Sequence, residues 1–269
     1  MKVEIDQSFE LLTNNEWNQY LSITIFENML ISIDLFEKYK NQMFHYPILE
    51  EMIKAHNNKI GELKITYALC RHYYDKGIPD EPWYISPGSN GESVQYFPRF
   101  EEEHWMRRYW FNHFSESLYL KIFSAWDSVV GIINVFYEIN ESMADYRFRS
   151  KVMKKLKSED LKMYDYLSSI LEDDVYVTAN SFRTDFVHSF APSTVTNVFS
   201  LDNTKKEMEF PEYHHGVIKM VKIEVEKQLT FGVGNYTYVR DVMENIELFA
   251  KYSGDKINAI IQLMTRDGE

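Results

Sequence analysis

The chain has 269 residues, of which 45% are hydrophobic and 16% aromatic, and its formal net charge is −12. The apolar content is enough for a sizeable core and excludes a disordered protein, because disordered chains have few aromatic residues and low hydrophobicity. The acidic charge excludes a general coat for duplex DNA, since such proteins need a basic surface. The charge does not exclude a small basic patch on an otherwise acidic surface, although a run of lysines is more often a solvated helix face. The candidate residues are Lys151, Lys154, Lys155 and Lys157.

The single cysteine, Cys70, excludes an intramolecular disulfide framework and a cysteine-rich zinc site. It lies in an apolar helical run, so we expect a buried structural residue. Residues 1–10 have neither a basic segment nor the apolar run of a signal peptide. The longest apolar run, around 129–136, is far shorter than the ~18–20 residues that a membrane span needs. We therefore expect a cytoplasmic protein with no membrane segment.

Two long helices are predicted at the start of the chain. Asn14 or Asn15 can cap a helix over about 16–44. Pro47 suits the first turn of a second helix, which would reach about residue 75 and stop at Gly77. Four of the seven prolines and three of the ten glycines then fall between Gly77 and Pro98. This composition predicts a long loop with at most a short strand.

A third helix is predicted from about residue 100, and its apolar residues recur in steps of three and four. They are Phe111, Phe114, Leu118, Ile122, Ala125, Val129, Ile132 and Phe136. A second apolar face carries Leu120, Phe123, Val130 and Ile133. A helix that is apolar nearly all round is expected at the centre of the fold.

Shorter helices are predicted at about 147–156, 158–171 and 175–190. Ser158 can cap the second of them, and Pro192 disfavours continuation of the third.

The pattern weakens over 193–236, where 195–199, 221–225 and 229–233 are candidate strands. Thr237 then caps a last helix to about residue 252, and Ser253 or Asp255 opens its continuation to about residue 264. The sequence thus predicts one mainly α domain over 1–269, with insertions at about 77–100 and 193–236.

Arg183 and His188 stand near the end of the predicted 175–190 helix, with four residues between them. This spacing, in a frame of long helices, resembles the Arg-x(4–6)-His motif of the HEPN superfamily. The resemblance covers about 14–190 and 237–264. It implies an all-α antiparallel bundle of the kind found in RNA-cleaving toxins, phage-defence factors and RNA-guided ribonucleases.

Two positions depart from the family pattern. Thr184 follows the arginine where many members have asparagine, and Asp185 comes next. Phe190 stands where one toxin branch carries a modifiable tyrosine, which argues against membership of that branch. Thr184 can still hydrogen-bond a phosphate or the histidine.

The residue types of the motif suit RNA cleavage without a metal or another cofactor. His188 can move a proton near neutral pH, and Arg183 can hold a phosphate through its guanidinium fork. The alternative is a purely structural role, in which Arg183 pairs with Asp185 or Glu172 on the surface and His188 is a helix-end histidine whose hydrogen bonds are satisfied.

Asp127 lies in the most apolar part of the third helix, between Trp126 and Val130. A carboxylate buried there must be paired or protonated. We expect it either to orient Arg183 or His188, as acids on the corresponding helix do in some family members, or to form a structural cap or salt bridge.

A di-iron bundle, built from paired Glu-x-x-His motifs and further glutamates, is a weaker alternative. Glu101 with His104 and Glu212 with His215 have the required spacing. The first pair is a charged helix start, and the second lies in a predicted loop.

The sequence therefore favours an RNA-cleaving or RNA-binding HEPN-like factor in defence, toxin–antitoxin or stress response. Its expected partners are RNA, a second copy of the chain, and an antitoxin or other protein. Residues five apart on a helix are separated by about 140°, so a homodimer with the site at its two-fold axis is expected to bring Arg183 and His188 together. The alternative function is a non-enzymatic helical interaction module that keeps the fold.

Overall fold

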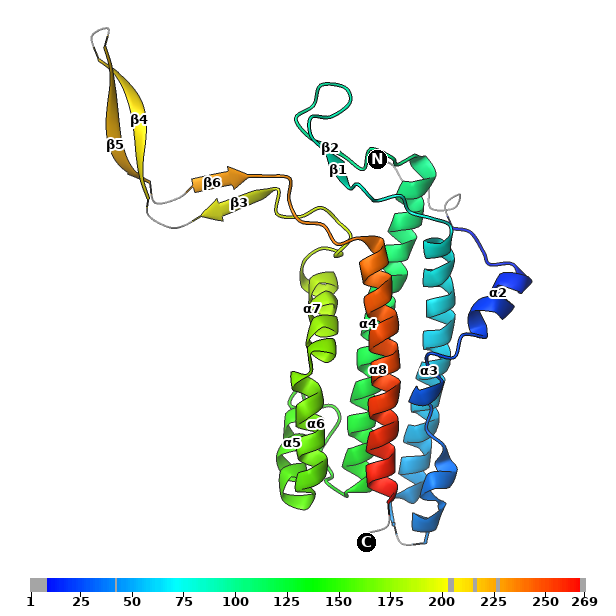
Figure 1. The fold of residues 1–269 in the computed structure, drawn as a ribbon. Helices are drawn as coiled ribbons and strands as arrows, with labels where there is room; N and C mark the ends of the chain where they lie inside the picture. The colour runs from blue at the N-terminus through cyan, green and yellow to red at the C-terminus, as the bar shows by residue number, and fades with distance from the viewer. Residues whose placement is uncertain (1–8, 42, 203–205, 215–216, 226–227, 267–269) are drawn as a thin grey trace.

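The computed structural model describes residues 9–41, 43–202, 206–214, 217–225 and 228–266. The fold is a mainly α bundle with a β arm that projects from one end (Figure 1). The mainly α prediction is confirmed. One continuous hydrophobic core joins the long helices to the shorter ones, whereas the one-domain organisation stays a prediction.

Helix α4 (Glu102–Phe136) is the centre of the bundle (Figure 1). It packs antiparallel to α3 (Tyr46–Asp75) and parallel to α8 (Val239–Thr265). By length and composition α4 could cross a membrane, but 72% of its most apolar window is buried inside the protein. The helix is therefore the core helix that its two apolar faces predicted.

The predicted boundaries of α3 hold because local signals set them. Pro47 occupies the first turn of α3, and Gly77 follows its end at a φ of +85°, which favours glycine. Cys70 is fully buried in α3, 3.4 Å from the Ser115 hydroxyl of α4. Burial raises the pKa of its thiol to about 12, so Cys70 is the structural residue expected.

The predicted helix over 16–44 is wrong. A short helix, α2 (Asn14–Leu21), is capped by Thr13 rather than by an asparagine. Beyond it, the described residues before α3 form two 3₁₀ segments, η1 (Glu27–Met29) and η2 (Ile33–Tyr39).

Tertiary contacts outweigh helix formation in this segment. Its apolar side chains are buried in the core, among them Phe26, Met29, Ile31 and Phe36. Side chains of α3 replace the missing helical hydrogen bonds. His56 Nε2 lies 2.8 Å from the Met29 carbonyl oxygen, and the Asn57 amide both donates to and accepts from the Ile31 backbone at 2.9 Å.

The second half of the bundle begins with α5 (Phe148–Glu159), α6 (Leu161–Glu172) and α7 (Asp174–His188). Asp160 caps α6 by accepting from Met163 N at 2.9 Å, so Ser158 is not the cap. Asp173 caps α7 in the same way. These caps divide the segment into short helices that pack beside α4 and α8 (Figure 1).

Helix α8 runs without the predicted break near Ser253. The Ser253 hydroxyl is buried and accepts from Trp126 Nε1 at 3.0 Å. Thr237 is not its cap either. Asp80, from the loop after α3, accepts from Val239 N at 2.8 Å and from the Tyr236 hydroxyl at 2.7 Å. A distant carboxylate therefore supplies the cap.

The two predicted insertions lie at the same end of the bundle (Figure 1). The first contains the two-residue strands β1 (Tyr84–Ile85) and β2 (Gln95–Tyr96). Trp83 in this loop stacks on Tyr236 with ring centroids 5.5 Å apart, which joins the first insertion to the base of the second.

The second insertion is an antiparallel arm. Strands β3 (Phe199–Asp202) and β6 (Gln228–Phe231) form its base, and β4 (Lys206–His214) and β5 (Val217–Val225) continue it outward. The strand predicted at 221–225 is part of β5, and the other two predicted strands are displaced by a few residues. Strand β4 was missed because Pro211, which it contains, argues against a strand.

Replacing residues 199–231 by an Asn-Gly turn is expected to leave the bundle as stable as before. Gly232 N donates to the Val198 carbonyl at 3.0 Å, and Thr196 and Asn235 exchange two backbone hydrogen bonds, so the ends of the arm already meet. Thermal unfolding is expected to change by less than about 0.5 kcal/mol. The control Asp80→Ala removes the cap of α8 and is expected to cost about 1–2 kcal/mol. A larger loss in the arm variant than in the control would contradict this expectation.

Candidate active site at the end of α7

Aromatic packing fixes the orientation of α7 on the bundle. Phe182 stacks on Tyr119 of α4 with ring centroids 5.9 Å apart and planes 5° apart, and Phe186 lies 5.7 Å from the same ring. The Tyr119 hydroxyl donates to Asn245 Oδ1 of α8 at 2.6 Å. Tyr119 thus connects α4, α7 and α8, and the Arg-x4-His motif lies on the helix that it supports.

Arg183 points inward from α7 and is half-buried. Its guanidinium carbon lies 5.1 Å from the centre of the Phe123 ring, and Nη1 makes a long contact of 3.4 Å with Asn180 Oδ1. Its Nε is buried without a hydrogen-bond partner. Among the described residues no carboxylate pairs with it, so the surface salt bridge to Asp185 or Glu172 is not present. A half-buried cation in this state retains the capacity to bind an anion.

His188 and the two residues beside the motif arginine face solvent. His188 is exposed in the last turn of α7. Thr184 donates its hydroxyl to the Asn180 carbonyl at 2.8 Å, so its hydrogen serves the helix while its oxygen stays open as an acceptor. Asp185 is exposed, and its backbone carbonyl accepts from Ser189 N at 2.9 Å.

One subunit does not aim Arg183 and His188 at a common point. Helix α7 continues as an α-helix through His188, so it does not distort between the two residues. Arg183 shares the inward stripe of buried Tyr176 and Ala179, whereas His188 lies on the exposed stripe with Thr184. The two side chains therefore belong to one element but to different faces of it.

The expectation that Asp127 is buried is wrong. Asp127 is exposed and lies seven residues after Leu120, another exposed residue of α4. Two turns separate them, so both occupy the one narrow stripe of α4 that faces solvent. Its neighbour Trp126 contacts Tyr176, which is about 10 Å along α7 from Arg183. Among the described residues nothing bonds to the Asp127 side chain.

The rival metal centre finds no support. His104 Nδ1 accepts from Glu101 N at 2.9 Å, and the two residues form a capping box at the start of α4. His215 lies outside the described residues. Within the described part of the chain, no group of three or more histidine, cysteine or carboxylate side chains lies together.

Two of the four lysines in the run on α5 have carboxylate partners. Lys151 pairs with Asp145 at 2.5 Å, and Lys155 pairs with Glu141 at 2.8 Å. Lys154 and Lys157 are exposed. The run is thus a solvated helix face rather than a concentrated basic patch.

Sequence reasoning missed a polar cavity of about 210 Å³ directly after α7. It is lined by Asp185, Ser189, Phe190, Ala191, Pro192, Thr196, Asn197, Asn235, Tyr236 and Thr237. The last three residues belong to the far side of the arm, which the local pattern does not place beside α7. Only Pro192, which stops the helix, is a local signal for the site.

A mainly α bundle with an Arg-x4-His motif at the end of a helix is the architecture that the HEPN resemblance implied. A family model described as HEPN_Cthe2314-like HEPN matches residues 52–252. The match spans most of the chain and includes the motif, so the chain belongs to the HEPN superfamily. No curated protein and no solved structure matches the chain.

Arg183→Met is expected to leave the free energy of unfolding within about 0.5 kcal/mol of the native value, or to raise it. The reason is that methionine keeps the packing on Phe123 and removes a half-buried charge that has no carboxylate partner. The control Phe182→Ala is expected to cost about 1–2 kcal/mol through lost aromatic burial. Chemical denaturation of both variants measures the difference. A large loss in Arg183→Met would mean that the arginine is structural.

Proposed function

We propose that this HEPN protein is a metal-independent endoribonuclease whose site is formed by Arg183 and His188. HEPN membership supports an RNA-related function, and the state of Arg183 is the observation that carries the proposal. The chain has 41 acidic residues, yet none of the described carboxylates pairs with this half-buried guanidinium. The proposed site thus keeps a cation for a phosphate and an exposed histidine for proton transfer.

The chemistry requires two proton transfers. A base takes the proton of the 2′-hydroxyl, whose oxygen attacks the adjacent phosphorus, and an acid protonates the leaving 5′-oxygen. The products are a 2′,3′-cyclic phosphate and a 5′-hydroxyl. One histidine cannot act as base and acid in the same step, but His188 from two subunits can. Thr184 and Asp185 would lie beside the reacting groups. Because the Thr184 hydroxyl donates to the Asn180 carbonyl, its oxygen can accept from the 2′-hydroxyl or from His188 but does not donate to the phosphate.

A homodimer through α7 would solve the geometric problem of the divided motif. Val177 and Val187 of α7 are 50% and 44% exposed, and Phe190 just beyond it is 62% exposed. Val187 and Phe190 lie close to His188 in the chain, whereas Val177 lies about 16 Å away along α7; all three would be covered by a second copy. A two-fold axis at this face brings His188 near its own copy. The half-buried Arg183 of each subunit would lie at the edge of the face, and together the four basic groups would create a local positive site on an acidic protein.

The second candidate is a non-enzymatic helical interaction module, in which α7 binds a protein partner such as an antitoxin. The exposed carboxylates of Asp174 and Asp185 favour this alternative, because they repel RNA from the same face. Both candidates fit a cytoplasmic role in defence, toxin–antitoxin systems or stress. Only the first candidate predicts that the protein cleaves RNA.

Purified protein is expected to cleave mixed RNA in excess chelator, because the proposed mechanism uses only side chains. The products should carry 2′,3′-cyclic phosphate ends, detectable by end-specific labelling. Arg183→Ala and His188→Ala should each abolish cleavage with native helicity. Asp127→Asn is the control on the exposed stripe of α4 and should retain activity, because this carboxylate is exposed and bonds to none of the described residues. Cleavage that disappears with chelator and returns with a divalent metal would contradict the mechanism.

Mixing Arg183→Ala and His188→Ala proteins, after subunit exchange, is expected to restore part of the cleavage activity. The mixed dimer holds one arginine and one histidine on opposite subunits, the two residues that α7 aims apart within one chain. Because it has only one His188, water must take the second proton-transfer role, so only part of the rate is expected to return. Sedimentation at micromolar concentration should show a dimer. Each variant incubated alone is the control. A monomer with full activity, or a mixture as inactive as its parents, would contradict the two-subunit site.

A further inference from the structure

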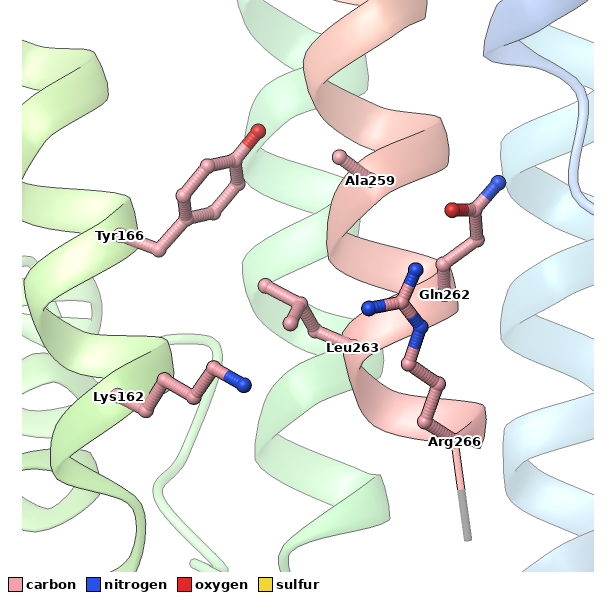
Figure 2. A pocket seen from close by; sticks show the side chains of 6 residues that line it. All are labelled: Lys162, Tyr166, Ala259, Gln262, Leu263 and Arg266. Carbon is pink, nitrogen blue, oxygen red and sulfur yellow. The ribbon is translucent and has the colours of Figure 1, made fainter.

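A groove separates α6 from the last turns of α8, far from the Arg183 site. Figure 2 shows Lys162 and Tyr166 projecting from α6 toward Ala259 and Leu263 of α8. The cavity has a volume of about 390 Å³. Along α8 it lies about 20 Å from Phe249, which packs against the Phe123 ring that carries Arg183. The proposed cleavage site does not use it.

The walls of the groove are apolar where the two helices face each other. The Tyr166 ring forms one wall and is half-buried, and Leu263 forms the other. Ala259 between them is small and leaves the space open (Figure 2). Burial raises the pKa of Tyr166, so its hydroxyl stays protonated and the wall adds no negative charge.

The rim of the groove is cationic. Lys162 lies on the α6 side and Arg266 on the α8 side, and both are exposed. Neither has a carboxylate partner among the described residues, and the lining includes no acidic residue. A third cation, Lys256, stands 5.7 Å from the centre of the Tyr166 ring and is likewise without an ion pair in the described chain.

This concentration of charge is unusual for the molecule. Several other cations of the bundle have acidic partners, as in Lys54 with Glu50 and Lys121 with Glu62 at 2.6 Å. In a protein of net charge −12, three cations around one apolar groove are the arrangement that an anion with an apolar body requires. The volume is near the lower end of the range of about 300–1,000 Å³ for ligand pockets.

We propose that the α6–α8 groove binds a small amphipathic anion. Its flat apolar body would lie between Tyr166 and Leu263, and its phosphate or carboxylate group would lie between Lys162 and Arg266. A guanidinium binds either group through paired hydrogen bonds. The proposal does not depend on RNA cleavage, because it uses none of the residues of α7.

Isothermal titration of the full chain with four probes tests the proposal. Adenosine 5′-monophosphate and indole-3-acetate each combine a flat body with an anion, one a phosphate and the other a carboxylate. Inorganic phosphate lacks the body, and adenosine lacks the charge. At least one of the first two is expected to bind more tightly than phosphate or adenosine, and the stronger of them identifies the anionic group. The proposal would be overturned if neither adenosine 5′-monophosphate nor indole-3-acetate binds, or if inorganic phosphate binds as tightly as they do.

Variants assign that binding to the groove. Lys162→Glu and Arg266→Glu are each expected to weaken it about tenfold, the effect of losing one charge-assisted contact. Ala259→Met fills the space without changing the charge and should abolish binding. Lys154→Glu makes the same charge change on exposed α5 and should leave binding intact, as should Arg183→Ala and His188→Ala. Unchanged affinity in Lys162→Glu, Arg266→Glu and Ala259→Met, with native circular dichroism, would overturn the assignment.

Discussion

The burial of α4 on almost every side is the constraint on which the rest of the structure depends. A 35-residue helix with so little polar surface is stable in water only when other elements cover it. Helices α3 and α8 cover two sides, α7 covers a third through Tyr119 and Phe123, and the segment around η1 and η2 closes the core between α3 and α8. The only exposed stripe left contains Leu120 and Asp127, which explains why an acid is tolerated in so apolar a sequence.

The same packing decides what the HEPN motif presents to solvent. Because Phe182 and Phe186 must reach the Tyr119 ring, the rotation of α7 about its axis is set, and Arg183 follows them inward onto Phe123. His188, five residues further on, is carried to the outer face. The division of the motif is thus a consequence of core packing, and it makes the proposed reaction depend on a second subunit.

The net negative charge of the chain makes its unpaired cations informative. In a chain with 41 acidic and 29 basic residues, acidic partners are abundant, and several lysines of the bundle have found them. Arg183 on α7 and the cations of the α6–α8 groove have not, within the described residues. They lie at separate places on the bundle, and these are the two positions at which we propose that an anion binds.

Local signals in the sequence determined the mainly α class, the ends of α3 and the central place of α4, because Pro47, Gly77 and the apolar period of α4 act within a few turns. The spacing of Arg183 and His188 likewise identified the family and the candidate residues. Only the tertiary structure decided that most of the predicted 16–44 helix does not form, that Asp80 caps α8, that Asp127 is exposed, and that the polar cavity forms beside α7. Each of these depends on groups distant in the chain, such as His56 and Asn57, which bond to the backbone of Met29 and Ile31. Helical periodicity identifies the residues that are expected to be buried. Three-dimensional packing determines which other elements bury them.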